Sequence, residues 1–190
     1  MSETWRTFFV ARFYCRATKK VLLDFRRCSG FFHHKRDNPM DFINTTPSSH
    51  WKANLRKGHI VSFKFPHERP GGDAPKRRTS LVMCVMRSND IELALLAYGT
   101  TKVGFSAPRR DLIIRINGDR DIAMASLKEK TMFTARRWVV VPLDDPRFCV
   151  KDGTAIIGRL PCSYMSRIDL VRGRLLEDIR RQALPHQVAA

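Results

Sequence analysis

The spacing of apolar and polar residues predicts a series of short β-strands between residues 58 and 160. Ile60–Phe65 alternates apolar and polar side chains, which is the period of a half-buried strand. Leu81–Met86 is a continuous apolar run and suits a strand that is buried on both faces. Four further segments have the length and composition of strands: Ile91–Tyr98, Leu112–Ile116, Val139–Val141 and Ala155–Leu160.

A change of period predicts that a helix follows these strands, from about Pro161 to Ala183 and before Pro185. Its apolar residues recur at helical spacing and form one stripe: Met165, Ile168, Val171, Leu175 and Ile179. Short strands at close spacing with one helix after them predict a mainly β fold, a small and strongly bent β-barrel with a C-terminal α-helix.

Two basic loops separate the predicted strands. Pro66–Arg78 contains three Pro and two Gly, and it follows the first strand directly. Gly99–Arg110 follows the third strand and also carries several basic residues. Loops of this kind bring Lys and Arg side chains to the mouth of the sheet.

The first part of the chain has a different composition. Residues 1–55 have scattered, mostly aromatic apolar residues, and residues 1–39 carry nine Lys or Arg against three Asp or Glu. We expect residues 1–55 to form a basic, partly disordered N-terminal extension, with Asn44–Trp51 as a polar linker. A start of translation at Met40 is an alternative that an intact-mass measurement tests. The barrel with its helix is then expected at 56–184, and a short tail at 185–190.

The charge of the chain favours a polyanionic partner. Its 190 residues include 35 Lys or Arg and 18 Asp or Glu, a formal net charge of +17 at pH 7. Nucleic acid is the partner that such an excess most often serves. An acidic protein partner is the alternative, and the two do not exclude each other.

The sequence also bears on the compartment of the protein, on membrane spans and on metal sites. The five cysteines form no CxxC pair, which favours a reducing cytoplasm, and no apolar run approaches the roughly 20 residues of a membrane span. Cys15, Cys28, His33 and His34 fit no common zinc spacing. We therefore expect no metal, no cofactor and no membrane partner.

Metal-independent cleavage of RNA is the chemistry that the basic and hydroxyl residues suit. The 2′-hydroxyl of RNA can attack the adjacent phosphorus if cations stabilise the phosphorane charge, and the planar guanidinium of arginine donates two hydrogen bonds to phosphate. A threonine hydroxyl can hold a phosphate oxygen. Arg78 and Thr100, at the ends of neighbouring predicted strands, would supply both groups.

Four segments in order resemble the PemK/MazF family of toxin ribonucleases. GHIVSFKF, a Gly/Pro loop and KRRTSLVMCV resemble the start of the family, and LLAYGTTK resembles its third strand. ASLKEKTMFTARRWVVV and IIGRLP resemble its later segment and the entry to its last helix. The resemblance implies an SH3-like barrel over about residues 55–181.

The resemblance also implies roles for particular residues. Arg78 falls on the catalytic arginine of the family and Thr100 on its catalytic threonine. Glu129 or Lys130 approximates a polar position near the cleft, and Thr79 stands where the family has proline. The residues expected to contact RNA are His67, Arg69, Lys76, Arg77, Thr101, Lys102, Arg109 and Arg110.

By this resemblance the protein would be the toxin of a type II toxin–antitoxin system, acting as a sequence-specific endoribonuclease. It would form homodimers and be inhibited by an acidic antitoxin. Two alternatives remain: a non-catalytic nucleic-acid-binding module on the same barrel, and a protein-targeting toxin that resembles the gyrase poisons. Growth arrest with intact RNA would indicate the latter.

Overall fold

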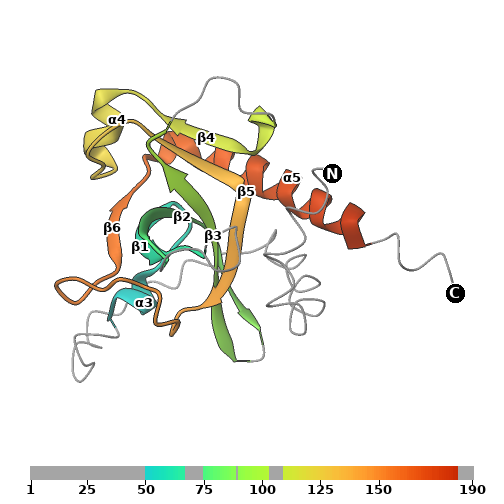
Figure 1. The fold of residues 1–190 in the computed structure, drawn as a ribbon, viewed down its shortest axis with the longest axis horizontal. Helices are drawn as coiled ribbons and strands as arrows, with labels where there is room; N and C mark the ends of the chain where they lie inside the picture. The colour runs from blue at the N-terminus through green and yellow to red at the C-terminus, as the bar shows by residue number, and fades with distance from the viewer. Residues whose placement is uncertain (1–49, 67–74, 89, 103–108, 184–190) are drawn as a thin grey trace, which may run out of the picture.

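Six antiparallel strands form one curled sheet that is closed part of the way into a barrel. The computed structural model describes residues 50–66, 75–88, 90–102 and 109–183. In these residues the strand order is β4-β5-β3-β2-β1-β6 (Figure 1). The strands are β1 His59–Lys64, β2 Arg77–Ser88, β3 Ile91–Thr100, β4 Ile113–Ile116, β5 Thr131–Pro142 and β6 Ile156–Arg159.

The centre of the sheet is the hairpin of β2 and β3. Its register pairs Ser88 with Ile91 next to the turn and Ser80 with Tyr98 at the far end. Asp90 adopts a φ of 63° in that turn, a left-handed conformation that Asp tolerates better than most residues. β1 then pairs with β2, and β5 with β3, so the β2–β3 hairpin lies in the middle of the sheet.

Among the described residues three helices accompany the sheet: α3 His50–Asn54, α4 Asp119–Met124 and α5 Met165–Ala183. A 3-10 turn at Cys162–Tyr164 leads into α5, and another at Arg110–Leu112 leads into β4. α5 passes behind β4 and β5 and buries Ile168, Val171 and Leu175 against the sheet (Figure 1). Each of these side chains contributes about 1.5–3 kcal/mol through burial.

The sheet separates two hydrophobic cores. The helix-side core includes residues of the sheet with the apolar stripe of α5: Ile60, Met83, Leu95, Ile114, Phe133, Ile168 and Val171. The aromatic core lies on the other face and includes Trp51, Phe63, Phe65, Leu96, Val141 and Phe148. The ring centroids of Phe63 and Phe148 are 5.0 Å apart in a nearly perpendicular arrangement, which favours attraction between ring edge and ring face.

Much of the predicted architecture is confirmed. The fold is mainly β with a C-terminal helix, each predicted strand lies in or overlaps an observed strand, and β2 is buried on both faces over Ser80–Cys84. β5 is longer than expected because a bulge lets the polar residues Arg136 and Arg137 sit inside a strand. In the part of the chain that the structure describes, no helix is long and apolar enough to cross a membrane.

Two short helices differ from the expectations. α4 begins directly after Gly118, in a segment where the sequence predicts no helix. α3 contains Trp51, which is 4% exposed and packs on Phe148 although the sequence assigns it to a polar linker. Residues 1–49, which hold most of the expected N-terminal extension, lie outside the described residues.

Candidate functional site

Arg78 and Thr100 lie at the same edge of the sheet. β2 begins at Arg77 and β3 ends at Thr100. The last pair in their register is Ser80 with Tyr98. Continuing the antiparallel ladder by two residues would bring Arg78 opposite Thr100. The β3 arrow in Figure 1 ends beside α4 and β4, which are therefore the neighbours of this edge.

Both residues also lie on one face of the sheet. Arg78 pairs with Phe63 of the aromatic core, and side chains of directly opposed residues share a face. Thr100 has the same parity along β3 as Tyr98, which packs against that core. Arg77 has the opposite parity, and its Nε donates a hydrogen bond of 2.5 Å to Ser62 Oγ.

A close approach of β2 and β3 fixes the distance between the two strands at this edge. A Cβ added to Gly99 would overlap the carbonyl oxygen of Thr79 and lie 3.0 Å from Phe133 Cε1. Only glycine therefore fits this position without a shift of backbone. Thr79, where the related family has proline, lies inside β2 and pairs with Ser62 of β1.

The two central residues differ in how they are held. The exposed Arg78 makes no hydrogen bond or ion pair with any residue that the structure describes. Thr100 is half-buried, and its Oγ1 accepts a hydrogen bond of 3.2 Å from the backbone N–H of Lys102. That bond leaves the threonine O–H as a donor, so a phosphate oxygen between the two strands can be bound by a cation and a hydroxyl.

An arginine stacked on aromatic rings lies next to this pair, and the sequence did not single it out. The Arg137 guanidinium carbon is 4.0 Å from the Tyr98 ring centroid and 5.7 Å from that of Phe65. Its Nη2 donates a hydrogen bond of 3.1 Å to the carbonyl oxygen of Pro66, just after β1. Arg137 enters this position because the bulge in β5 places Thr134 rather than Arg137 opposite Tyr98. The pattern of apolar and polar residues does not predict this bulge.

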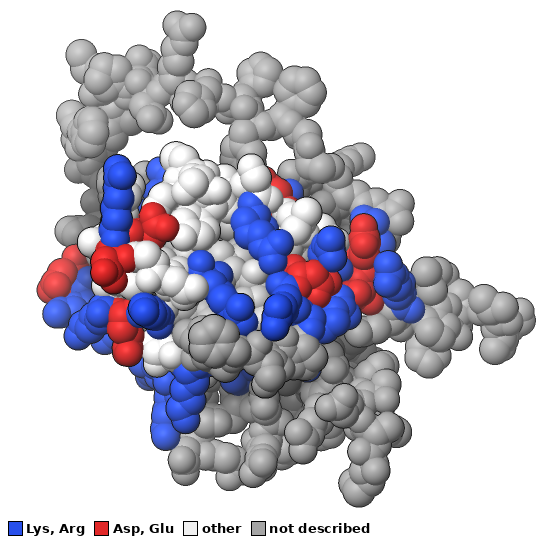
Figure 2. Space-filling view, turned by 90° about the horizontal axis from the view of Figure 1, so that it is seen from above, with Lys and Arg blue, Asp and Glu red and all other residues white. Residues whose placement is uncertain are grey.

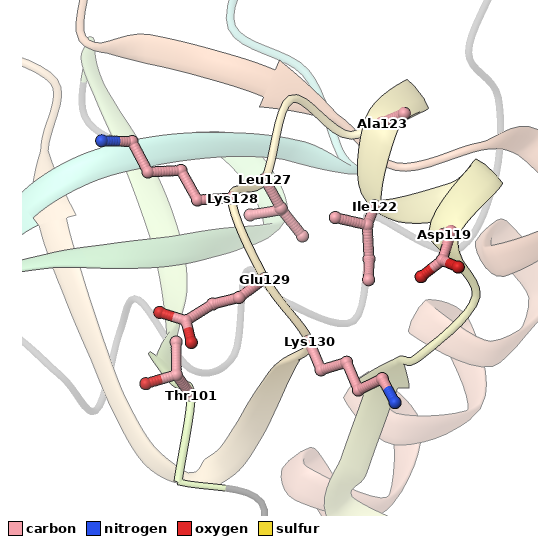
Figure 3. A pocket seen from close by; sticks show the side chains of 8 residues that line it. All are labelled: Thr101, Asp119, Ile122, Ala123, Leu127, Lys128, Glu129 and Lys130. Atoms are coloured by element: carbon pink, nitrogen blue, oxygen red, sulfur yellow. The ribbon is translucent and has the colours of Figure 1, made fainter.

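A pocket of about 480 Å³ opens beside Thr101 at the same end of the sheet. Figure 3 shows Ile122 and Leu127 along its apolar side and the Glu129 carboxylate turned toward Thr101. Lys128, Lys130 and Asp119 line the rest of the rim. The residues that the resemblance places near a cleft, Glu129 and Lys130, therefore do border a pocket with one of the predicted threonines.

Arg109, near the end of the second basic loop, is bound to the helix α5. Arg109 donates to the Asp178 carboxylate of α5 at 2.6 Å and to Asp111 at 3.2 Å, and Arg174 reaches Asp111 at 3.3 Å. The hydrogen bond from Arg109 lowers the pKa of Asp111, and the two carboxylates raise the pKa of Arg109. The exposed Arg109 is therefore paired with two carboxylates, and the RNA contact that the sequence predicts for it stays a prediction.

The surface at this end is basic but not uniformly so. Seen from the end that carries α4 and β4, Lys and Arg side chains spread over the surface with Asp and Glu among them (Figure 2). Lys76, Arg77, Lys102 and Arg110 are all exposed. His67 and Arg69, the remaining predicted RNA contacts, lie outside the described residues.

His59 does not reach Arg78 and Thr100. His59 is at the opposite end of β1 from Lys64, which pairs with Arg77, so it lies about 17 Å along the strand from the site edge. Burial, together with the charges of Arg159 and Arg56, lowers the pKa of His59. Within the described ranges no three His, Cys, Asp or Glu side chains gather as they would around a metal ion. Cys15, Cys28, His33 and His34 lie outside those ranges.

Comparison with known proteins adds no assignment to this site. No protein-family model matches the chain, and no curated protein matches it significantly.

Proposed function

We propose that this protein is a metal-independent endoribonuclease of the PemK/MazF-like type, and the toxin of a type II toxin–antitoxin pair. The observation that carries the proposal is the placement of Arg78 and Thr100 at one edge and on one face of the sheet. The curled six-stranded sheet with its C-terminal helix supports an SH3-like barrel, which is the fold of that family.

The reaction would use the RNA as its own nucleophile. The 2′-oxygen attacks the adjacent phosphorus while a base takes its proton, and the bond from phosphorus to the 5′-oxygen breaks as that oxygen gains a proton. The products are a 2′,3′-cyclic phosphate and a 5′-hydroxyl. The Arg78 guanidinium stabilises the charge that develops on the phosphorane, and Thr100 holds a phosphate oxygen. Glu129, beside Thr101, is the described carboxylate best placed to take the proton.

The basic surroundings support RNA as the substrate. Arg77, Lys102 and Arg110 would bind flanking phosphates, and the Arg137–Tyr98 stack offers a flat surface on which a base can lie. The same charge would attract an acidic antitoxin, since complementary charge accelerates association. A homodimer, as in the related family, belongs to the same proposal.

RNA cleavage in EDTA tests the proposal directly. Wild-type protein should produce discrete fragments ending in 2′,3′-cyclic phosphate, and Arg78→Ala should lower the rate about 10²–10³-fold. Arg87→Ala, which removes an equal charge at the opposite end of β2, is the matched control and should cleave normally. Intact RNA with folded wild-type protein would reject the ribonuclease.

A non-catalytic nucleic-acid-binding module is the alternative that one observation favours. Neither Arg78 nor Thr100 has a hydrogen bond to a carboxylate or a histidine among the described residues. A module of this kind would bind RNA with a strong dependence on salt and would never cleave it. Retention of an RNA oligonucleotide without fragments, weakened only modestly by Arg78→Ala, would establish this reading instead.

A further inference from the structure

A second basic pocket, separate from the edge that carries Arg78, lies between β4 and α5. It has a volume of about 310 Å³ and is lined by Arg110, Ile113, Ile114, Arg115, Tyr164 and Arg167. Three of these six residues are arginines, and they come from three different elements: the turn before β4, β4 itself and α5. None of the lining residues is acidic.

The fold holds one of the three guanidinium groups in place through backbone atoms. Arg167 donates from Nη2 to the carbonyl oxygens of Ile113 at 3.1 Å and Arg110 at 3.0 Å, and from Nε to Ile113 at 3.3 Å. Carbonyl oxygens fix the side chain but carry no net charge. The full positive charge of Arg167 therefore remains beside the pocket.

Two carboxylates bonded to or next to lining residues have partners in the fold. Asp111 is bonded to Arg109 and Arg174, and Asp121 accepts a hydrogen bond of 2.6 Å from the Tyr164 hydroxyl. Burial and that hydrogen bond raise the pKa of Tyr164 to about 12, so its ring adds no negative charge at neutral pH. The charged residues of the lining itself are therefore all arginines, which favours an anionic ligand.

We propose that this pocket binds a phosphate group, carried either by a free mononucleotide or by a nucleotide of an RNA strand. Guanidinium groups bind phosphate oxygens in pairs, and arginines from several elements suit a tetrahedral anion. The Tyr164 ring and the apolar Ile113 and Ile114 provide surface for a sugar or a base, and the volume falls within the range of small-ligand sites.

The position of Arg115 connects this pocket with the strands of the candidate site. Arg115 pairs with Met132 of β5, and Met132 pairs with Thr100 of β3. Two strand spacings separate Arg115 from Thr100, a backbone distance of about 10 Å. One RNA strand can span that distance, but binding of phosphate to the pocket does not depend on the ribonuclease proposed above.

Titration of the full-length protein tests the pocket without any reaction. Inorganic phosphate and adenosine 5′-monophosphate are added in turn, and the amide signals of Ile113, Ile114 and Arg115 are followed by NMR. We expect saturable shifts, with affinity for the nucleotide about tenfold or more weaker in Arg115→Gln, because hydrogen bonds to a charged group are lost. Arg115→Lys keeps the charge but loses the planar guanidinium that binds phosphate through two hydrogen bonds. Its affinity for the nucleotide should therefore lie between those of Arg115→Gln and the wild type.

Control variants separate the pocket from general charge. Arg110→Gln removes an exposed lining arginine, so it tests the pocket even if Arg115→Gln fails to fold. Arg87→Gln removes the same charge at the far turn and should bind like the wild type. The absence of saturable shifts, or equal weakening by Arg87→Gln, would overturn the proposal.

A second titration, with RNA, decides whether the phosphate belongs to a free mononucleotide or to an RNA strand. An RNA oligonucleotide is titrated into Arg78→Ala protein with and without Arg115→Gln. Weaker RNA binding in the double variant assigns the pocket to a nucleotide of the RNA strand, whereas unchanged RNA binding assigns it to a free mononucleotide. If wild-type protein binds nucleotide here yet never cleaves RNA, the pocket stands and only the ribonuclease fails.

Discussion

The start of β2 and the turn before β4 are both basic, yet the structure uses their arginines in opposite ways. Arg78 is exposed and has no polar partner among the described residues. Arg109 is bonded to Asp111 and to Asp178, a residue of α5 that lies 69 positions later in the chain. The first arginine is available to a ligand, whereas the second connects a turn to a helix.

The difference shows that residues of equal formal charge do not contribute equally to the binding of an anionic ligand. Both arginines contribute one unit to the charge of +17. An arginine whose charge is already compensated gains less from a phosphate, because it must give up or share its carboxylates. The local charge of a folded surface therefore indicates a ligand site better than the total does.

The largest effect expected from this comparison concerns catalysis. Arg78→Ala should lower RNA cleavage in EDTA about 10²–10³-fold because the phosphorane loses its cation. The free energy of unfolding, measured by urea titration, should change by less than about 0.5 kcal/mol, since the side chain is exposed. A large loss of stability would show that Arg78 is structural and would remove the contrast with Arg109.

The next effect concerns the approach of β2 to β3 that sets Arg78 against Thr100. Gly99→Ala should lower the free energy of unfolding by about 2–3 kcal/mol, because the new Cβ overlaps the carbonyl of Thr79. Gly173→Ala is the matched control, since nothing lies within 4 Å of the added carbon, and it should stabilise α5 by about 1 kcal/mol. Equal urea midpoints for the two variants would refute the close approach.

Asp145 provides an ion pair that is buried, unlike that of Arg109. Burial alone would raise its pKa, but the side-chain and backbone hydrogen bonds from Arg147 outweigh burial and lower it. Its contribution to stability is therefore complete above the unfolded pKa near 3.9 and is lost as the pH falls through the lower folded value. Asp145→Asn should cost about 1.5–3 kcal/mol at pH 7.

The pH series distinguishes this pair from its neighbour. Unfolding of Asp145→Asn in urea should depend less on pH below about pH 4 than unfolding of the wild type. Asp144→Asn, at an exposed position next to it, should change stability at pH 7 by less than about 1 kcal/mol. If the free energy of unfolding fell equally with decreasing pH in Asp145→Asn and in the wild type, the ion pair would not be the source of the pH dependence.

The smallest effect is expected at Arg109. Arg109→Ala should leave the cleavage rate close to that of the wild type and reduce the free energy of unfolding by less than about 1 kcal/mol, because exposed ion pairs contribute little. Cleavage assays beside Arg78→Ala and urea titrations measure both quantities. A loss of cleavage as large as that of Arg78→Ala would mean that Arg109 leaves its carboxylates to bind RNA.

Strands with a clear period were the elements that the sequence predicted best. Ile60–Phe65 and Leu81–Met86 correspond to β1 and to the buried part of β2, because alternation and apolar runs reflect burial on one or two faces. The helix over residues 161–183 was predicted for the same reason. β5 was predicted over only three residues, since Arg136 and Arg137 interrupt its apolar pattern at the bulge.

The candidate site was predictable only in part. Arg78 and Thr100 could be selected because each ends a predicted strand, and neighbouring strands of a hairpin bring their ends together. The Arg137–Tyr98 stack could not be selected, because it depends on a bulge that brings residues 39 positions apart into contact. α4 was missed because its six residues are too few to show a helical period.

The sequence by itself determined the mainly β class, the C-terminal helix and the excess of basic charge, because these follow from local periodicity and from composition. The tertiary structure alone decided which arginines are neutralised, since Asp178 and Arg109 meet only when α5 packs beside the turn before β4. It also decided that Arg110, Arg115 and Arg167 share one pocket. Contacts of this kind join residues that are distant in the chain, and no local pattern encodes them.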